Sequence, residues 1–167
     1  DKKGCYSLTS EKRNGMVYIT IPSGYEMVMA EADPVPPLWA VLKEEPTVAE
    51  RHDFALKRVD NRRHVVIAVG DPQLSNRLQD VRQFEENVMP RIREEVERYR
   101  KDGVAVYTLS MGDSSFDTYW YDCLFDISDY RTLLKRCNYP TTYFNTMGNH
   151  DNDLATKHNA DTDFNAA

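Results

Sequence analysis

The pattern of hydrophobic and polar positions divides the chain near residue 60. Before it, short alternating or apolar runs are separated by turn-like stretches, and these runs are CYSLTS (5–10), MVYITI (16–21), LWAVLK (38–43) and HDFALKRV (52–59). Alternation with a period of two is typical of half-buried β-strands, and Asn14-Gly15 predicts a tight hairpin turn between the first two runs. Because four strands are few for an independent sandwich, we expect residues 1–60 to form a partial β-sandwich-like N-terminal domain.

After residue 60, three mainly apolar runs alternate with helical patterns. The runs are HVVIAVGD (64–71), VAVYTLSMGD (104–113) and TTYFNTMGNHD (141–151). Such runs are expected for strands of a parallel sheet that are buried on both faces. Apolar residues spaced by three or four predict the helices between them, namely Leu78, Val81, Phe84, Val88, Ile92, Val96 and Tyr99, then Leu124, Ile127, Tyr130, Leu134 and Cys137.

Together these elements predict a β-α-β-α-β unit of the α/β class, with parallel strands, over residues 61–167. Pro90 predicts a kink in the first helix or the start of a second segment, and Gly103 predicts the end of that helix. Three strands and two helices do not cover both faces of a parallel sheet. We therefore expect the α/β half to be cut short at its C-terminal end, as the β half is at its beginning.

Composition and charge narrow the functional classes. The 167 residues carry a net charge of −6 with a pI near 5.2, which disfavours nucleic acid as a partner because binding phosphates needs a basic surface. No apolar run approaches the ~20 residues that cross a bilayer, and the N-terminus lacks the layout of a signal peptide. Cys5, Cys123 and Cys137 include no C-x-x-C pair, so zinc-ribbon and disulfide frameworks are disfavoured. We expect Cys123 and Cys137 to be small core residues, and the redox state of all three cysteines stays open.

Polar side chains with metal-binding chemistry follow each of the three predicted strands, each group directly after a glycine. They are Asp71, Gln73, Asp113, Asp117, Asn149, His150 and Asp151. A single Gly-Asp pair after a strand usually forms a turn or caps a helix. Three such groups on successive parallel strands lie at one edge of the sheet, where ligands bind in open α/β folds. Carboxylate, amide and imidazole groups together suit divalent cations such as Mn, Fe or Zn.

The stretches GDPQ (70–73), GDSSFD (112–117) and GNHD (148–151) resemble the first three motifs of the calcineurin-like metallophosphoesterase family, which includes the purple acid phosphatases. The resemblance covers residues 64 to about 153. IPSGYEM (21–27) and RHDFALKRVDNRRH (51–64) also resemble the β domain that precedes the catalytic domain in some exported bacterial members. The resemblance implies hydrolysis of a phosphate ester by a metal-activated water, two divalent metal ions, and an exported, periplasmic or cell-surface location.

The resemblance also implies a role for each matching residue. Asp71 would ligate the first metal ion, Asp113 would bridge the two ions, and Asn149 would ligate the second. His150 would stabilise or protonate the leaving oxygen. Asp151 would orient His150 through a hydrogen bond.

Two features depart from the family pattern. Gln73 stands where the family has histidine, and its amide oxygen would ligate with less donated charge, which favours a harder metal or a weaker first site. The later histidine ligands of the family have no counterpart, and His158 lies in a polar stretch only eight residues past His150. We therefore expect this chain alone to bind metal weakly and to turn over little substrate.

The substrate and the class of function stay open at the level of sequence. Asp117, Trp120 and Asn152 are candidates for a substrate pocket, while Trp120 equally suits a helix start packed on the sheet and Asn152 a helix cap. Nucleotides, phosphoproteins, phospholipids and sugar phosphates all fit as substrates. The alternative function is a non-catalytic binding or structural module on a degenerate phosphoesterase scaffold. A flavodoxin-like or receiver domain also places Asp at strand ends, but it explains neither GNHD nor the β half.

Overall fold

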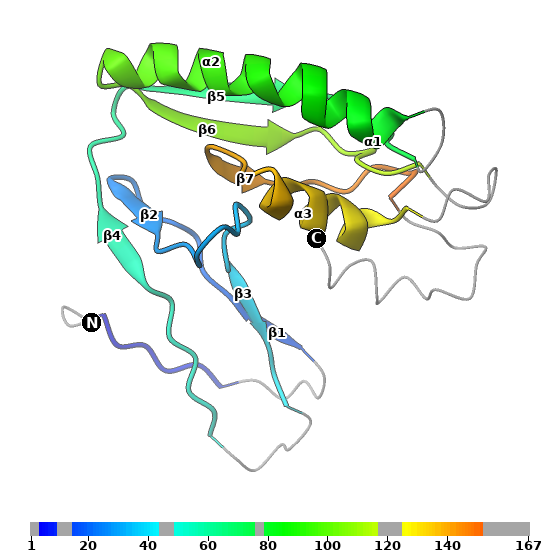
Figure 1. The fold of residues 1–167 in the computed structure, drawn as a ribbon. Coiled ribbons are helices and arrows are strands. Elements are labelled where there is room, and N and C mark those ends of the chain that lie inside the picture. Colours follow the sequence, from blue (N-terminus) through cyan, green and yellow to red (C-terminus); the bar gives the residue numbers. More distant parts are fainter. Residues whose placement is uncertain (1–3, 10–14, 44–48, 76–78, 117–124, 152–167) are drawn as a thin grey trace.

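A computed structural model describes residues 4–9, 15–43, 49–75, 79–116 and 125–151 of the chain. The protein is a mixed α/β structure with one three-stranded parallel sheet and two two-stranded antiparallel sheets (Figure 1). Both antiparallel sheets come from the part of the chain before residue 60, and the parallel sheet comes from the part after it.

The first half of the chain pairs strands that are distant in sequence. β1 (Met16–Tyr18) pairs with β3 (Trp39–Val41), and β2 (Tyr25–Met27) pairs with β4 (Leu56–Arg58), both in antiparallel fashion. The sequence predicted that MVYITI pairs with CYSLTS. This pairing is wrong, because residues 5–9 form no strand. The turn itself lies outside the described residues.

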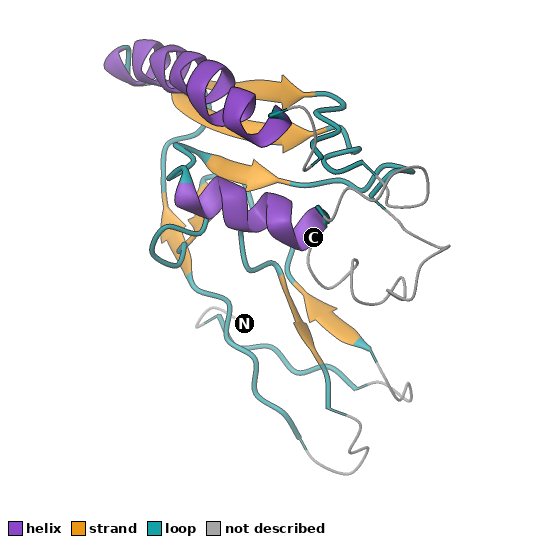
Figure 2. Ribbon diagram, turned by 45° about the vertical axis from the view of Figure 1, so that its right-hand side comes forward, coloured by secondary structure: helices purple, strands orange, loops and turns teal. Residues whose placement is uncertain are grey.

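The predicted β-α-β-α-β arrangement with parallel strands is confirmed. β5 (His64–Val69), β6 (Ala105–Ser110) and β7 (Thr142–Phe144) are all parallel, with β6 in the centre. When successive strands are added in one direction by crossovers of one hand, their helices fall on the same face of the sheet. Figure 2 shows the two long helices beside the parallel strands. Both helical segments share one buried cluster, in which the ring centres of Phe84 and Tyr130 lie 6.0 Å apart.

The first helical segment is divided close to its proline. It comprises α1 (Asp80–Gln83), the π-helical turn η1 (Phe84–Val88) and α2 (Met89–Lys101). Pro90 lies in the first turn of α2, where the fixed φ of proline and its missing N–H are tolerated. Pro90 therefore marks the start of a second segment, which is one of the two outcomes that the sequence predicted.

The π-helical turn moves the buried face of this helix by one residue. The Met89 N–H bonds to the Phe84 carbonyl five residues back, so this turn holds one residue more than an α-helical turn. Phe84 and Val96 are buried as predicted, but Val88 is 42% exposed and Met89 is fully buried in its place. The predicted position of Val88 in the core is therefore wrong.

The C-terminal end of α2 is a Schellman motif. Gly103 has a φ of +68°, and its N–H donates to the Arg100 carbonyl at 3.0 Å. The Val104 N–H donates to the Tyr99 carbonyl at 3.1 Å. These two bonds satisfy carbonyls that the helix end would leave unpaired, so the predicted helix end at Gly103 is confirmed.

α3 (Ile127–Arg136) begins with a reciprocal pair of hydrogen bonds. Asp126 Oδ1 accepts from the Asp129 N–H at 2.9 Å, and Asp129 Oδ2 accepts from the Asp126 N–H at 3.2 Å. This capping box satisfies two donors at the helix start. The described part of the predicted apolar stripe is buried in the cluster on the sheet, with Ile127, Tyr130, Leu134 and Cys137 among its members. Leu124 and Cys123, which were also predicted to be in the core, lie outside the described residues.

The opposite face of the parallel sheet is only partly covered. β5 alternates between exposed and half-buried residues, and Val66 is 48% exposed. The prediction that this strand is buried on both faces is therefore wrong. The physical reason is that both helices pack on one face, so the alternate residues of this edge strand point away from the core.

Segments of the first half do reach the parallel sheet and its helices. Asp33 forms ion pairs with Arg131 at 3.0 Å and Lys135 at 2.9 Å on α3. Burial alone would raise the pKa of Asp33, but the hydrogen bonds from Lys135 and Arg131 outweigh it and lower this pKa. On the outer edge of β7, the Tyr143 N–H donates to the Pro34 carbonyl at 2.8 Å. The two halves are thus joined by charged and backbone contacts.

Candidate functional site

The loops that follow β5 and β6 stay hydrogen-bonded beyond the ends of their strands. The Gln73 N–H donates to the Asp113 carbonyl at 2.8 Å, and the Leu74 N–H donates to the Ser114 carbonyl at 3.2 Å. The Phe116 N–H returns a bond of 3.0 Å to the Leu74 carbonyl. The first two predicted motifs therefore lie side by side at the carboxyl edge of the sheet.

The loops that follow β6 and β7 touch through two glycines. A Cβ atom on Gly112 would lie 2.6 Å from the Gly148 nitrogen, and a Cβ on Gly148 would lie 2.0 Å from Asp113 Oδ1. At distances this short, a side chain at either position would force neighbouring atoms to shift. The His150 N–H also donates to Asp113 Oδ1 at 2.9 Å. Asp113 is therefore fixed in direct contact with the third motif.

Three of the predicted metal ligands have an unusual backbone conformation. Asp71 and Gln73 each have a φ of +43°, and Asp113 has a φ of +50°. Non-glycine residues in this left-handed region are uncommon and cost energy, and they cluster at functional sites. Neither aspartate is a helix N-cap, because those positions are Gln79 and Asp126. The capping explanation for these two Gly-Asp pairs is therefore excluded.

Asp151 ties the second and third loops together. Its side chain is 3% exposed. Its Oδ1 accepts from the Ser115 N–H at 2.9 Å and from the Ser115 hydroxyl at 3.2 Å, while its Oδ2 accepts from the Gly148 N–H at 2.9 Å. These bonds show a carboxylate that fixes the loops. That Asp151 also orients the His150 ring stays a prediction.

The remaining predicted residues differ in their exposure. His150 is half-buried, and its ring stacks on Phe116 with the ring centres 5.0 Å apart and an interplanar angle of 15°. Asp71 and Asn149 are exposed at the same edge of the sheet. The predicted pocket residues Asp117, Trp120 and Asn152 lie outside the described residues, as does His158.

The donor atoms of the predicted ligand set are carboxylate and amide oxygens. Asp71 and Asp113 are its only acidic members, and Gln73 and Asn149 supply amides. Within the described ranges, no group of three or more His, Cys, Asp and Glu side chains is arranged to hold a metal ion. A site built from this predicted set would include the amide oxygens of Gln73 and Asn149.

Ser115 and a buried layer of hydroxyls beneath the loops were not singled out from the sequence. Ser114 and Ser115 are buried, and the hydroxyls of Tyr130 and Tyr143 are 2.9 Å apart in the core. Burial raises the pKa of Tyr130 most, and the neighbouring Tyr143 raises it further. The buried phenol is therefore held protonated. The only sequence signal for the serines was their place inside the GDSSFD stretch, where they read as loop residues.

In comparisons with known proteins, no family model, no curated protein and no solved structure matches the chain. Among the helices of the described ranges, none has both the length and the apolar character needed to cross a membrane.

Proposed function

We propose that the chain is part of a metal-dependent phosphoesterase that hydrolyses a phosphate ester. The assignment of residues 61–167 to the N-terminal half of a calcineurin-like phosphoesterase domain, and of residues 1–60 to a β-sandwich-like domain, belongs to this proposal. The observation that carries it is the contact of Asp113 with Gly148 and His150. This contact brings the second and third motifs together at one point, where ligands bind in open parallel sheets.

The donor set suits two divalent cations. Asp113 Oδ1 accepts from the His150 N–H, and an ionised carboxylate has about four lone-pair sites, so Asp113 retains capacity to bridge two ions. Asp71, Gln73 and Asn149 add three further oxygen donors. Among Mn, Fe and Zn, a set made of oxygen atoms alone favours Mn.

His150 and Asp151 have different roles in the proposed reaction. When bound, the two cations would supply an activated water and neutralise charge on the phosphoryl oxygens. His150, supported by the face of Phe116, would give a proton to the leaving oxygen. Asp151 would hold the loop that carries His150 through its bonds to Ser115 and Gly148.

The test measures Mn²⁺ binding to the 167-residue chain through the paramagnetic broadening of its amide NMR signals. We expect weak, saturable Mn²⁺ binding that broadens the amides of residues 112–115 and 148–151 first. Asp113→Asn should weaken this binding about tenfold or more, because it removes the bridging charge. Asp102→Asn is the matched control, since it removes the same charge at the exposed end of α2.

The outcomes separate the two candidate functions. Equal Mn²⁺ binding by the two variants, or broadening away from these loops, would overturn the metal site and favour the non-catalytic binding or structural module. Mn²⁺-dependent hydrolysis of p-nitrophenyl phosphate that disappears in Asp113→Asn would support the phosphoesterase. We expect this hydrolysis to be slow in the present chain, and a rate equal to that of a longer chain would contradict the expectation of missing ligands.

A further inference from the structure

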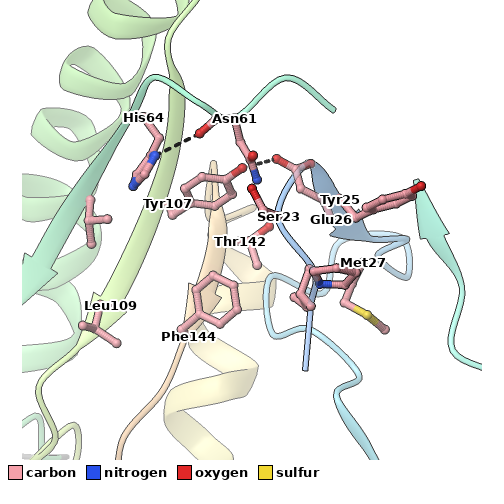
Figure 3. Close-up of a pocket in the computed structure, with 13 residues that line it drawn as sticks. Ser23, Tyr25, Glu26, Met27, Asn61, His64, Tyr107, Leu109, Thr142 and Phe144 are labelled. Carbon is pink, nitrogen blue, oxygen red and sulfur yellow. Dashed lines mark hydrogen bonds between the residues drawn. The ribbon is translucent and has the colours of Figure 1, made fainter. Parts of the chain in front are cut away.

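A cavity lies on the face of the parallel sheet that the helices leave uncovered. It has a volume of about 390 Å³ and opens between β2 and strands β5, β6 and β7 (Figure 3). None of the predicted phosphoesterase residues lines it. A cavity of this size falls in the range that holds small molecules.

The walls of the cavity are mainly apolar and aromatic. The sheet contributes Tyr107 and Phe144, whose rings lie 6.3 Å apart at an interplanar angle of 52°, together with Leu109. Met27 and Tyr25 of β2 lie on the other side. Aromatic faces of this kind attract cations because the ring quadrupole is negative above the ring plane.

One end of the cavity carries a carboxylate. Glu26 Oε1 accepts from the Tyr107 hydroxyl at 2.6 Å, and this bond is visible in Figure 3. Among the described lining residues, Glu26 is the only carboxylate, and none is a lysine or an arginine. His64 points its Nδ1 at the Asn61 carbonyl 3.0 Å away, and since a carbonyl only accepts, this nitrogen carries the proton.

The carboxylate of Glu26 is paired with a lysine that lies outside the lining of the cavity. Lys57 Nζ lies 3.3 Å from Glu26 Oε2, but the Lys57 side chain is 56% exposed whereas that of Glu26 is 22% exposed. Exposed ion pairs of this kind contribute little, because water screens them. Among the lining residues, Glu26 therefore supplies the carboxylate next to the aromatic rings, and a bound cation would compete with Lys57 for it.

We propose that this cavity binds a small organic cation, such as an alkylated ammonium compound. The aromatic rings of Tyr107 and Phe144 contact the alkyl groups and Glu26 supplies the opposite charge. The inference does not depend on the phosphoesterase proposal, because it uses different residues on another face of the sheet.

The test compares two probes of the same shape by amide-shift titration of the 167-residue chain. Choline is cationic, and 3,3-dimethylbutan-1-ol is its neutral isostere. We expect choline to bind about tenfold more tightly than the alcohol, the gain typical of a cation–π and charge contact in a partly desolvated pocket. The shifts should centre on Tyr107 and Phe144.

Two variants with opposite expected effects sharpen the test. Glu26→Gln removes the charge but retains an oxygen that accepts from Tyr107, and it should reduce the preference for choline over the alcohol to the part that the aromatic rings supply. Lys57→Met removes the competing cation at an exposed position and should tighten choline binding about two- to threefold. Equal binding of the two probes, binding of neither, or a Lys57→Met variant that binds choline less tightly would overturn the proposal.

Discussion

Replacement of Gly148 by alanine should destabilise the protein, because this glycine packs directly against Asp113. The new Cβ would lie 2.0 Å from Asp113 Oδ1 and 2.4 Å from the Asp113 nitrogen, whereas real Cβ contacts stay beyond 3.0 Å. Asp113 must therefore shift by about 1 Å, and backbone cannot yield as a flexible side chain does. Overpacking of this kind costs about 1–3 kcal/mol, and weakening the bond from the His150 N–H adds about 1 kcal/mol.

The measurement is urea or thermal denaturation of Gly148→Ala beside Gly70→Ala. We expect the free energy of unfolding to fall by about 2–4 kcal/mol, equivalent to roughly 4–16 °C in Tm for a chain of this size. Gly70 is the matched control, because it also lies in a loop after a parallel strand and a Cβ there meets nothing within 4 Å. If the two variants proved equally stable, the close packing of Gly148 against Asp113 would not exist in solution.

Two further predictions concern buried polar groups. Asp151→Asn should cost about 1–3 kcal/mol in urea denaturation, because the new amide N–H₂ must face a donor on Ser115 or Gly148. Ser115→Ala, which removes only the hydroxyl donor, should cost less, and the reverse order would contradict the described bonds. Burial, then the hydrogen bond to Glu26, raises the pKa of Tyr107 to about 12 from 10.0. Between pH 10 and pH 12 the folded chain keeps a proton on Tyr107 that the unfolded chain releases. The wild type should therefore lose more stability than Tyr107→Phe as the pH rises through this range. Equal losses of stability for the two proteins, measured by denaturation at both pH values, would contradict the prediction.

The parallel direction of the three strands could be predicted from the sequence, because three apolar runs separated by two helical patterns favour a β-α-β-α-β unit. The burial of β5 could not. A run such as HVVIAV satisfies a strand at the edge of a sheet as well as one in its centre. Which of the two occurs depends on the strand order and on the side that the helices take, and neither is encoded in the run itself.

The position of Met89 in the core shows a second limit. A search for a period of 3.6 residues selects Val88, because it lies four positions after Phe84. The π-helical turn adds one residue, so the buried position falls on Met89. Pro90 was a visible signal of an irregularity, but the sequence does not show whether a proline kinks a helix or follows a wider turn.

At the candidate site, the edge at which the motif residues gather follows from the topology alone. The contacts between the loops could not be predicted from the sequence. Asp151 was expected to act on His150, whereas its described bonds go to Ser115 and Gly148. A glycine in a motif predicts a turn, but the contact of Gly148 with Asp113 arises from two loops that are 35 residues apart in sequence.

The bond between Pro34 and Tyr143 bears on self-association. A short strand at the border of a sheet offers unpaired N–H and C=O groups to a strand of another molecule, which is a common route to aggregation. Here the Pro34 carbonyl already occupies the Tyr143 N–H on the outer side of β7. Proline residues at 34, 36 and 37 cannot donate to a further strand. The proline-containing segment therefore hinders the addition of another β-strand at this border.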